Sequence, residues 1–309
     1  MSVLFLGTLI FFIISTINLM NLNRFTNIDK LIVHPGSAHR DDFLSVALIL
    51  GSVPGSCIIV ERRDPTDNDL EDLDTLVVDQ GREYNPEKNN FDHHQFPIEA
   101  DPACSITLIL KALECYEDAL EIWNWLRPSE IQDVRGPNFL AKELNIPGGG
   151  DTLLAVQGSP VEGYLLNMFQ KATRIQPGDF LFQFLEELGI SMLSGIKNIL
   201  ERLEDLKINA SVFQVNSHTI IDNSYIPKDK HPGRGMNLFR KKYHPDAQIT
   251  ISSDKRGEGV CMTRTNDDGI IDFRNIKEEQ GVRFVHASGF MCAIHKGIEL
   301  KPLIEKSIC

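Results

Sequence analysis

The feature that most constrains this 309-residue chain is the segment Phe91-Asp92-His93-His94-Gln95, in which a carboxylate precedes two imidazoles. Neighbouring side chains on an extended strand point to opposite faces, so one histidine can face a given site while the other serves its rim. Three consecutive residues able to bind metal rarely serve a hydrophobic core. The segment therefore predicts a polar site where a buried strand ends.

Two earlier apolar runs also end in side chains that can bind metal. Leu31-Ile32-Val33 is followed by His34 and then by His39-Arg40-Asp41-Asp42, and Leu76-Val77-Val78 is followed by Asp79. Open α/β sheets place their sites at the carboxyl ends of the strands. If these runs are neighbouring strands, their polar residues would converge on a metal centre.

The spacing of apolar residues from residue 28 onward alternates short strands with helices. It predicts strands at 31–34, 56–60 and 76–79 and helices at 41–50, 105–114, 119–126 and 179–206. This order is typical of an α/β fold with a parallel sheet. The polar stretch 62–74 is expected to be a loop, and the Gly- and Pro-rich stretch 136–163 is expected to be a loop or a mobile insertion.

A smaller α+β domain is expected to begin near Lys207. Its candidate strands are 212–215, 219–222, 248–252, 260–264 and 283–285. Two of its loops carry groups that can bind phosphate, namely Arg234 within Pro-Gly-Arg-Gly and the segment that contains His286, Ser288 and Gly289. The basic run 240–242 is more typical of a solvated face.

The net charge of −12 argues against non-specific attraction to nucleic acid. The charge is unevenly divided, because residues 1–206 carry 15 basic and 31 acidic side chains whereas residues 207–309 carry 16 and 12. An acidic part able to hold cations is thus followed by a mildly basic part. Two differently solvated surfaces would give the same pattern.

Residues 3–20 form an almost wholly apolar run with no charged residue. Residues 1–27 are therefore either an upstream extension or a membrane anchor. The six cysteines show no metal-finger spacing, which favours free thiols in a reducing compartment and a cytoplasmic location.

These motifs carry a family resemblance. The series of His34, His39, Asp41, Asp79, Asp92-His93-His94 and Asp133 resembles, in order, the four metal motifs of the DHH phosphoesterase superfamily. Within it, the chain is most similar to the Myg-type (melanocyte-proliferating-gene) family of metal-dependent hydrolases and exonucleases. Further matches are Arg63-Asp64-Pro65, Tyr84-Asn85-Pro86 and the segment 285–290. The resemblance covers about residues 30–309.

The first and fourth motifs depart from the family pattern. Pro35, Ala38 and Asp42 stand where the family has Asn, Phe and Glu, and Asp133-Val134-Arg135 replaces Asp-Asn-Gly. The ligand positions survive, so these changes bear on the shape of the substrate pocket.

The resemblance implies a catalytic domain at residues 28–206, which includes a linker helix, and a substrate-binding domain at 207–309. One ion would be held by His34, His39 and Asp79. The second would be held by Asp41, His93 and Asp133, with Asp79 bridging the two ions. Mixed imidazole and carboxylate ligands suit Mn²⁺ better than Mg²⁺.

The same resemblance assigns His94 to the phosphate or leaving group and Asp92 to the orientation of an imidazole. Arg234, His286, Ser288 and Gly289 would bind the substrate. The expected activity is hydrolysis of phosphodiester bonds by a 3'-5' exonuclease acting on short RNA or DNA. A pyrophosphate or small-nucleotide hydrolase and a non-catalytic metal-binding scaffold are the alternatives.

Overall fold

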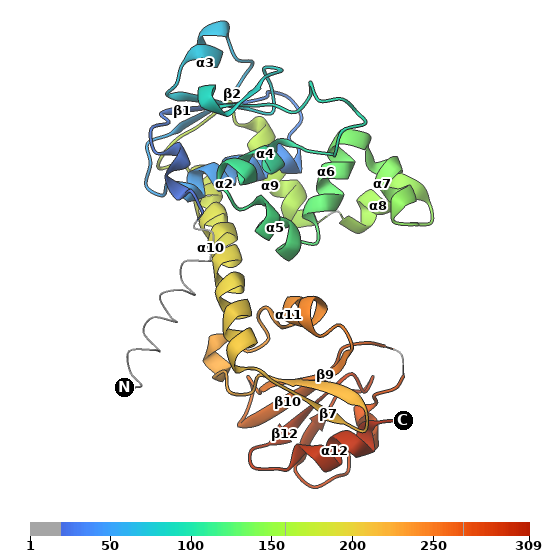
Figure 1. Cartoon of the computed structure of the whole chain (residues 1–309). Coiled ribbons are helices and arrows are strands. Elements are labelled where there is room, and N and C mark those ends of the chain that lie inside the picture. The colour runs from blue at the N-terminus through green and yellow to red at the C-terminus, as the bar shows by residue number, and fades with distance from the viewer. Residues whose placement is uncertain (1–19, 158, 268) are drawn as a thin grey trace, which may run out of the picture. The chain divides into compact units, whose positions relative to one another are not determined.

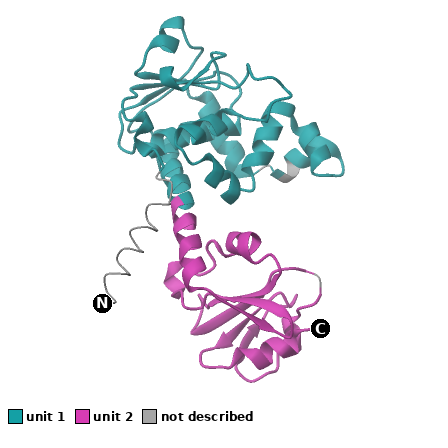
Figure 2. Ribbon diagram, in the orientation of Figure 1, with its two compact units in different colours: residues 1–196 teal, residues 197–309 magenta. Residues whose placement is uncertain are grey.

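The computed structural model describes residues 20–157, 159–267 and 269–309. The chain divides into two compact units, residues 1–196 and 197–309, which Figure 2 colours separately. Each unit contains a six-stranded sheet accompanied by helices (Figure 1). The mixed α/β class expected from the sequence is confirmed.

The sheet of the first unit has the strand order β4-β5-β3-β1-β2-β6. Its strands are β1 (Lys30–Val33), β2 (Ile59–Arg62), β3 (Thr75–Val78), β4 (Tyr84–Asn85), β5 (Asn90–Phe91) and β6 (Arg174–Ile175). β5, β3, β1 and β2 run parallel, and antiparallel β4 and β6 form the edges. Every residue of β3 is buried, as a continuous apolar run predicts for a central parallel strand.

Helices α2, α4 and α9 lie together beside this sheet (Figure 1). The α-helices of the unit before α10 are α2 (Arg40–Ser52), α3 (Asp67–Glu71), α4 (Ser105–Ala112), α5 (Tyr116–Ile122), α6 (Leu126–Arg135), α7 (Pro137–Glu143), α8 (Gly149–Gln157) and α9 (Pro160–Lys171). The 3-10 helices are η1 (Leu22–Phe25) and η2 (Pro86–Lys88). The helix expected at 41–50 is α2, and that expected at 105–114 is α4.

The expectation of a loop at residues 136–163 is wrong, because α7, α8 and the start of α9 occupy this stretch. Proline opens α7 and α9, where the missing backbone N–H is not needed. Gly136, with a φ of +81°, separates α6 from α7. Leu140 and Leu153 are buried in a small core between α7 and α8. Gly and Pro here punctuate helices instead of preventing them.

Two further boundaries differ from the sequence expectation. The tryptophans Trp123 and Trp125 lie in the turn between α5 and α6, with ring centroids 5.1 Å apart, and not inside one helix. The expected loop at 62–74 contains the short helix α3. Thr66 begins α3, because its hydroxyl accepts a hydrogen bond from the Asp69 N–H and its own N–H donates to the Asp69 carboxylate.

Helix α10 (Phe180–Asn209) corresponds to the amphipathic stretch 179–206, and the division between the two units falls within it. Two glycines allow α10 to approach α2 closely. A Cβ atom on Gly189 would lie 1.8 Å from the Ala47 carbonyl oxygen, and one on Gly51 would lie 2.3 Å from the Gly189 backbone. The absence of side chains at these two positions therefore fixes how α10 packs on α2.

The sheet of the second unit has the strand order β11-β12-β10-β9-β8-β7, and only β8 and β9 are parallel neighbours. Its strands are β7 (Ser211–Val215), β8 (His218–Asp222), β9 (Ala247–Ser253), β10 (Gly259–Arg264), β11 (Val282–Val285) and β12 (Met291–His295). Its helices are η3 (Lys228–Lys230), α11 (Met236–Tyr243), η4 (Phe273–Ile276) and α12 (Leu300–Ser307). The basic run 240–242 ends α11. All five expected strands are present, whereas β12 and α12 were not expected.

The apolar run 3–20 lies outside the described residues except for Met20, and so does the expected membrane anchor or extension over these positions. Within residues 20–157, 159–267 and 269–309, no helix is both long enough and apolar enough to cross a membrane.

Candidate metal centre

Three neighbouring strands deliver the central residues of the candidate site. In the register of the first sheet, the last residues of β1, β3 and β5 lie side by side. The residues that follow these strands are His34, Asp79 and Asp92, so all three emerge at the carboxyl edge of the sheet. The convergence expected from the sequence arises from this register.

Asp79 is the centre of the site. Its Oδ1 lies 3.0 Å from His93 Nε2, and its Oδ2 lies 3.4 Å from His34 Nε2. The side chain is buried, and the residue has a φ of +61°, a left-handed conformation that non-glycine residues rarely adopt and that clusters at functional sites. Each carboxylate oxygen thus faces a different imidazole, which is the arrangement expected of a carboxylate shared by two cations.

A second group joins the first turn of α2 to α6. Its members are His39, Asp41 and Asp133, each of which offers a ligand atom within 4.8 Å of the others. Asp41 Oδ2 accepts a hydrogen bond of 2.8 Å from Ser105 Oγ. Asp133 Oδ2 lies 3.2 Å from His93 Nε2, so His93 connects this group to Asp79.

Asp42 belongs to the site, although the sequence motifs did not assign it a role there. Its Oδ2 lies 3.2 Å from His34 Nε2 and 3.7 Å from Nη2 of the buried Arg62. Its Oδ1 accepts a hydrogen bond of 2.9 Å from the His39 N–H at the start of α2. The signal that could have revealed Asp42 is its place in the first motif, where the resembling family has glutamate.

Burial and charge repulsion shift the titration of these groups. Burial, followed by the nearby Asp41 charge, raises the pKa of Asp79 to about 8 and that of Asp133 to about 8. The hydrogen bond to Asp42 raises the pKa of His34 to about 9. Carboxylates clustered in a low-dielectric site cannot all be ionised unless positive charge compensates them. The arrangement therefore favours a bound cation.

Asp92 and His94 form a separate pair at the rim. Asp92 is buried, and its Oδ1 lies 2.6 Å from His94 Nδ1, while 54% of the His94 side chain is exposed. Burial opposes ionisation of Asp92, yet hydrogen bonds from the His94 ring, the His94 N–H and the Arg82 N–H hold its pKa below the usual range. His94 is thus held by a carboxylate at one ring nitrogen and is open to solvent.

A cavity of about 580 Å³ adjoins the second group of ligands. It is lined by His39, Asp41 and Asp133 together with residues of α6, α8 and α9. A cavity of this size can hold a small organic ligand. The candidate metal residues therefore lie in the wall of a pocket large enough for a substrate group.

Residues 30–101 match the family model MYG1_exonuc, described as an uncharacterised protein family, UPF0160. Over these residues the chain is similar to the Myg-type family. The matched segment contains every candidate metal residue except Asp133.

No curated protein matches the chain. A solved structure described as the DHH domain of a member of a family of ribosomal proteins aligns with 12% identity and a TM-score of 0.29, covering 92% of this chain and 86% of the other. The structure of an uncharacterised protein from Helicobacter pylori G27 aligns with 10% identity and a TM-score of 0.23, covering 89% and 99%.

The match of residues 30–101 to this family model points to a metal-dependent phosphoesterase, and the residues of the site fit divalent cations. Asp41 Oδ1 is buried and accepts no hydrogen bond from any described residue, so its lone pairs are available to a cation. Imidazole nitrogens and carboxylate oxygens together form a donor set typical of transition metals.

The grouping of ligands differs from the one that the resemblance implied. His39 was expected beside His34 and Asp79, but its ligand atom groups with Asp41 and Asp133. The His34 and His39 ring centroids are 5.6 Å apart. His34 instead groups with Asp79 and Asp42.

The second unit holds the residues expected to bind substrate in two loops. His286 Nδ1 lies 2.8 Å from Ser288 Oγ, and the Gly289 N–H donates to the His286 carbonyl. Gly289 has a φ of +70°, and a Cβ there would lie 2.1 Å from Asp272 Oδ1, so only glycine fits. Arg234 is exposed in a different loop, before α11.

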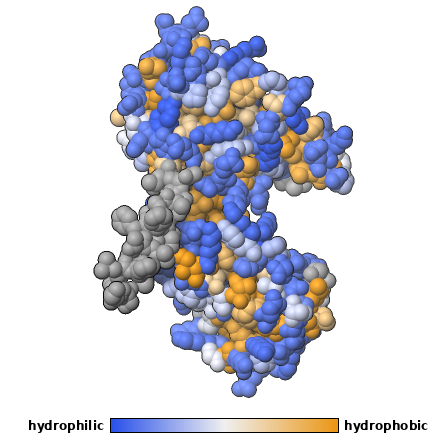
Figure 3. All heavy atoms as spheres, viewed as in Figure 1, coloured by the Kyte–Doolittle hydropathy of each residue, from blue (hydrophilic) through white to orange (hydrophobic). Residues whose placement is uncertain are grey.

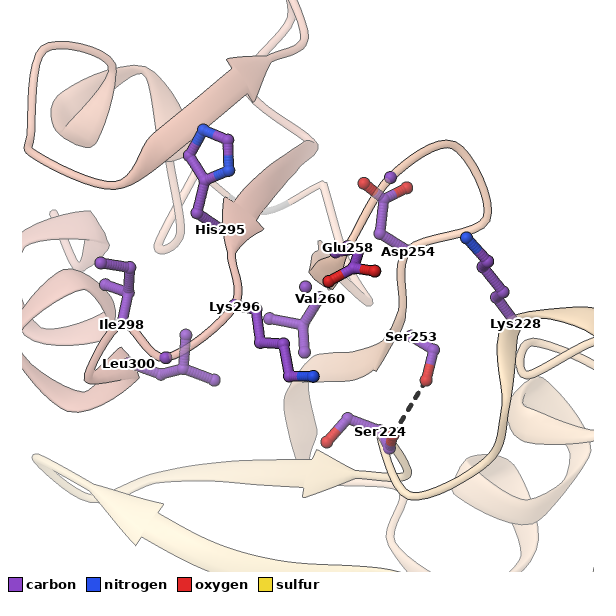
Figure 4. A pocket seen from close by; sticks show the side chains of 13 residues that line it. Ser224, Lys228, Ser253, Asp254, Glu258, Val260, His295, Lys296, Ile298 and Leu300 are labelled. Carbon is purple, nitrogen blue, oxygen red and sulfur yellow. Dashed lines mark hydrogen bonds between the residues drawn. The ribbon is translucent and has the colours of Figure 1, made fainter.

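A further cavity of about 360 Å³ lies in the second unit (Figure 4). Its wall mixes Lys228 and Lys296 with Asp254 and Glu258, and a hydrogen bond of 2.8 Å joins Ser253 Oγ to the Ser224 carbonyl. The residues expected to bind substrate do not line it. Its opposite charges give it no preference for an anion.

Proposed function

We propose that this Myg-type chain is a divalent-metal-dependent phosphodiesterase that removes nucleotides from the 3' end of short RNA or DNA. The observation that supports it best is Asp79, whose two carboxylate oxygens face the imidazoles of His34 and His93. Sites that cleave phosphodiesters commonly hold two metal ions about 3.5–4 Å apart. A carboxylate between two sets of ligands fits that use.

The proposed site holds two ions, and its mixture of imidazole and carboxylate donors suits Mn²⁺. The ligands would be His34, His39, Asp41, Asp79, His93 and Asp133. When bound, the two ions would supply a nucleophile from water at neutral pH and offset the charge that develops on the phosphoryl oxygens. The Pro35 carbonyl would orient His34, because it accepts a hydrogen bond of 2.6 Å from His34 Nδ1 and leaves Nε2 for a metal ion. Asp42 Oδ2, 3.2 Å from Nε2, adds a further carboxylate beside that ion.

His94 is the residue proposed to handle the proton of the leaving group. Asp92 Oδ1 holds the Nδ1 side of the ring at 2.6 Å, which leaves Nε2 as the atom able to give a proton to the departing oxygen.

The second unit is proposed to bind the phosphates of the strand through Arg234, His286, Ser288 and Gly289. Its surplus of basic residues supports this role. Arg234→Ala and His286→Ala should then leave the metal content unchanged. Both variants should bind longer strands less tightly, with a smaller effect on short strands, because a longer strand has more phosphates in contact with the second unit.

The test of the function is hydrolysis of end-labelled RNA and DNA oligonucleotides with Mn²⁺, with Mg²⁺ and with chelator. We expect stepwise shortening from the 3' end with Mn²⁺ and none with chelator. Pyrophosphate and dinucleotides, assayed in parallel, distinguish the small-substrate alternative, which the cavity of about 580 Å³ also fits. Cleavage that is indifferent to chelator would refute the metal-dependent mechanism.

Asp79→Asn is the informative variant for the shared carboxylate. Asparagine tolerates the left-handed backbone, whereas alanine at a φ of +61° would add strain to the loss of the ligand. We expect Asp79→Asn to lower metal occupancy and to abolish turnover. Asp151→Asn, an exposed acid at the start of α8, is the matched control and should be silent.

A further inference from the structure

Arg40 lies between two of the candidate metal residues in the sequence and lines the same cavity as both of them. Its Nε donates to Glu162 Oε1 at 2.6 Å, and its Nη2 donates to Glu162 Oε2 at 3.0 Å. This is a two-point contact between a planar guanidinium on α2 and a carboxylate on α9. About a third of each side chain is exposed, so the pair is open to the cavity.

The charges around the cavity make Arg40 distinctive. Among its described lining residues, Arg40 is the one arginine or lysine, whereas Asp41, Asp133 and Glu162 are acids. An anionic group entering this wall meets repulsion unless positive charge offsets it. Arg40 can provide that charge directly beside the metal residues.

The remaining walls suit an organic group with both apolar and polar atoms. Pro137, Leu154 and Leu166 contribute apolar surface, and Gln132 and Gln157 contribute amide groups. Leu154 is 45% exposed, and Figure 3 shows hydrophobic side chains over the region of α6–α8. Pockets of this kind, apolar with a few polar groups, bind small organic ligands whose polar atoms match.

We propose that this cavity seats one nucleotide of the substrate and that Arg40 binds its phosphate oxygens, so that Arg40 anchors the nucleotide next to the cleaved bond. The Glu162 carboxylate competes with this phosphate for Arg40, because it already accepts hydrogen bonds from Arg40 Nε and Nη2. This proposal rests on the proposed phosphodiesterase function. It adds the position and the recognition of the terminal nucleotide.

Binding is measured directly, by titration calorimetry of the full chain with uridine monophosphate and adenosine monophosphate. Inorganic phosphate and the free nucleosides are separate ligands, which distinguish the phosphate contact from the contact with the base. The variants are Arg40→Ala, Arg40→Lys and Glu162→Gln. Arg174→Ala, which breaks an exposed ion pair with Glu61 at 3.2 Å, is the matched control.

Arg40→Ala should weaken binding of the nucleoside monophosphates about tenfold, as one charged hydrogen-bond pair implies, and should leave nucleoside binding unchanged. Arg40→Lys should recover part of the loss, because lysine keeps the charge but not the two-point geometry. Glu162→Gln should strengthen binding several-fold. Circular dichroism and metal content, measured on each variant, identify any that fail to fold.

The outcome that overturns the proposal is equal nucleotide affinity in the wild type, Arg40→Ala and Glu162→Gln, or no nucleotide binding in the wild type. If oligonucleotides are nevertheless cleaved, the function stands and the assignment of Arg40 is wrong. If nucleotide binding depends on Arg40 as expected but no strand is cleaved, the cavity assignment stands and the exonuclease function is wrong.

Discussion

Asp42 and Arg62 form a buried ionic contact beneath the candidate metal centre. The Asp42 side chain is fully buried, and Arg62 also donates to the carbonyls of His34 and Phe169 at 3.0 Å. The contact thus connects β1, β2, α2 and the end of α9. Removing one member of such a pair leaves the other buried without its counter-charge.

We expect Asp42→Ala to lower the free energy of unfolding by about 3 kcal/mol. Asp42→Asn should cost less, because an amide oxygen can still accept the His39 N–H that begins α2. Urea denaturation in the presence of chelator measures both changes without a contribution from metal. A loss below about 0.5 kcal/mol for Asp42→Ala would show that the pair is energetically silent.

Asp69 predicts a pH dependence that is separate from the metal residues. Hydrogen bonds from Arg63, followed by those from Thr66, hold its pKa well below the usual range of an aspartate. Because the folded pKa is depressed, the stabilisation is present above about pH 4 and is lost as the pH falls below the unfolded pKa.

Asp69→Asn should therefore cost about 2 kcal/mol at pH 6 and progressively less as the pH falls toward about 3. The measurement is the difference in unfolding free energy between the wild type and the variant across that range. A difference that is constant with pH, or that grows on acidification, would contradict the assigned ionisation of Asp69.

At the residue scale, the sequence predicts ligand types better than ligand groups. His34 and Asp79 could be found because each follows an apolar run, and Asp92 could be found because it opens the Asp-His-His segment. The pairing of His39 with Asp133 could not, because it depends on how α6 packs beside α2, and no spacing in the sequence encodes that contact.

At the scale of elements, the close approach of α2 and α10 depends on Gly189. A Cβ atom there would overlap the Ala47 carbonyl oxygen, so Gly189→Ala must push the helices apart or distort one of them. Gly195, in the same helix, has no atom within 4 Å of the position of a Cβ. Both glycines have a helical backbone, and they differ in the space available to an added Cβ atom.

Gly189→Ala should destabilise the protein by about 3 kcal/mol through overpacking. Gly195→Ala should stabilise it by up to about 1 kcal/mol, because alanine favours the helix. Thermal unfolding of both variants measures the contrast. If both substitutions raise the melting temperature, the close contact between α2 and α10 is not present in solution.

Apolar spacing located β1–β3 of the first sheet and β7–β11 of the second, because these strands carry apolar residues that the core buries. It did not locate the two-residue strands β4, β5 and β6, nor β12. The same reasoning failed over residues 136–163, where Gly and Pro indicate a loop. Proline at the first turn of α7 and of α9 is compatible with a helix, and the apolar contacts of Leu140 and Leu153 supply the reason for the helices to form.

For the whole molecule, the sequence indicated two domains with a boundary near 206/207, and the structure divides at 196/197, within α10. Because α10 continues through the boundary between the units, no Gly- or Pro-rich linker lies there. Amino-acid composition alone therefore does not reveal the position of the boundary. All six candidate ligands lie in the first unit. The two units should therefore respond differently to a divalent cation.

Hydrogen exchange with and without Mn²⁺ tests this difference. A ligand that binds only the folded state at about a hundred times its dissociation constant stabilises that state by about 2.7 kcal/mol, which slows exchange through global opening about a hundredfold. We expect this slowing in β1, α2, β3 and α6 and little change in β7–β12. The Asp79→Asn variant should show less slowing in the first unit, which separates metal binding at the site from non-specific ion effects. Equal slowing in both units of the wild type, retained in the variant, would place the metal elsewhere.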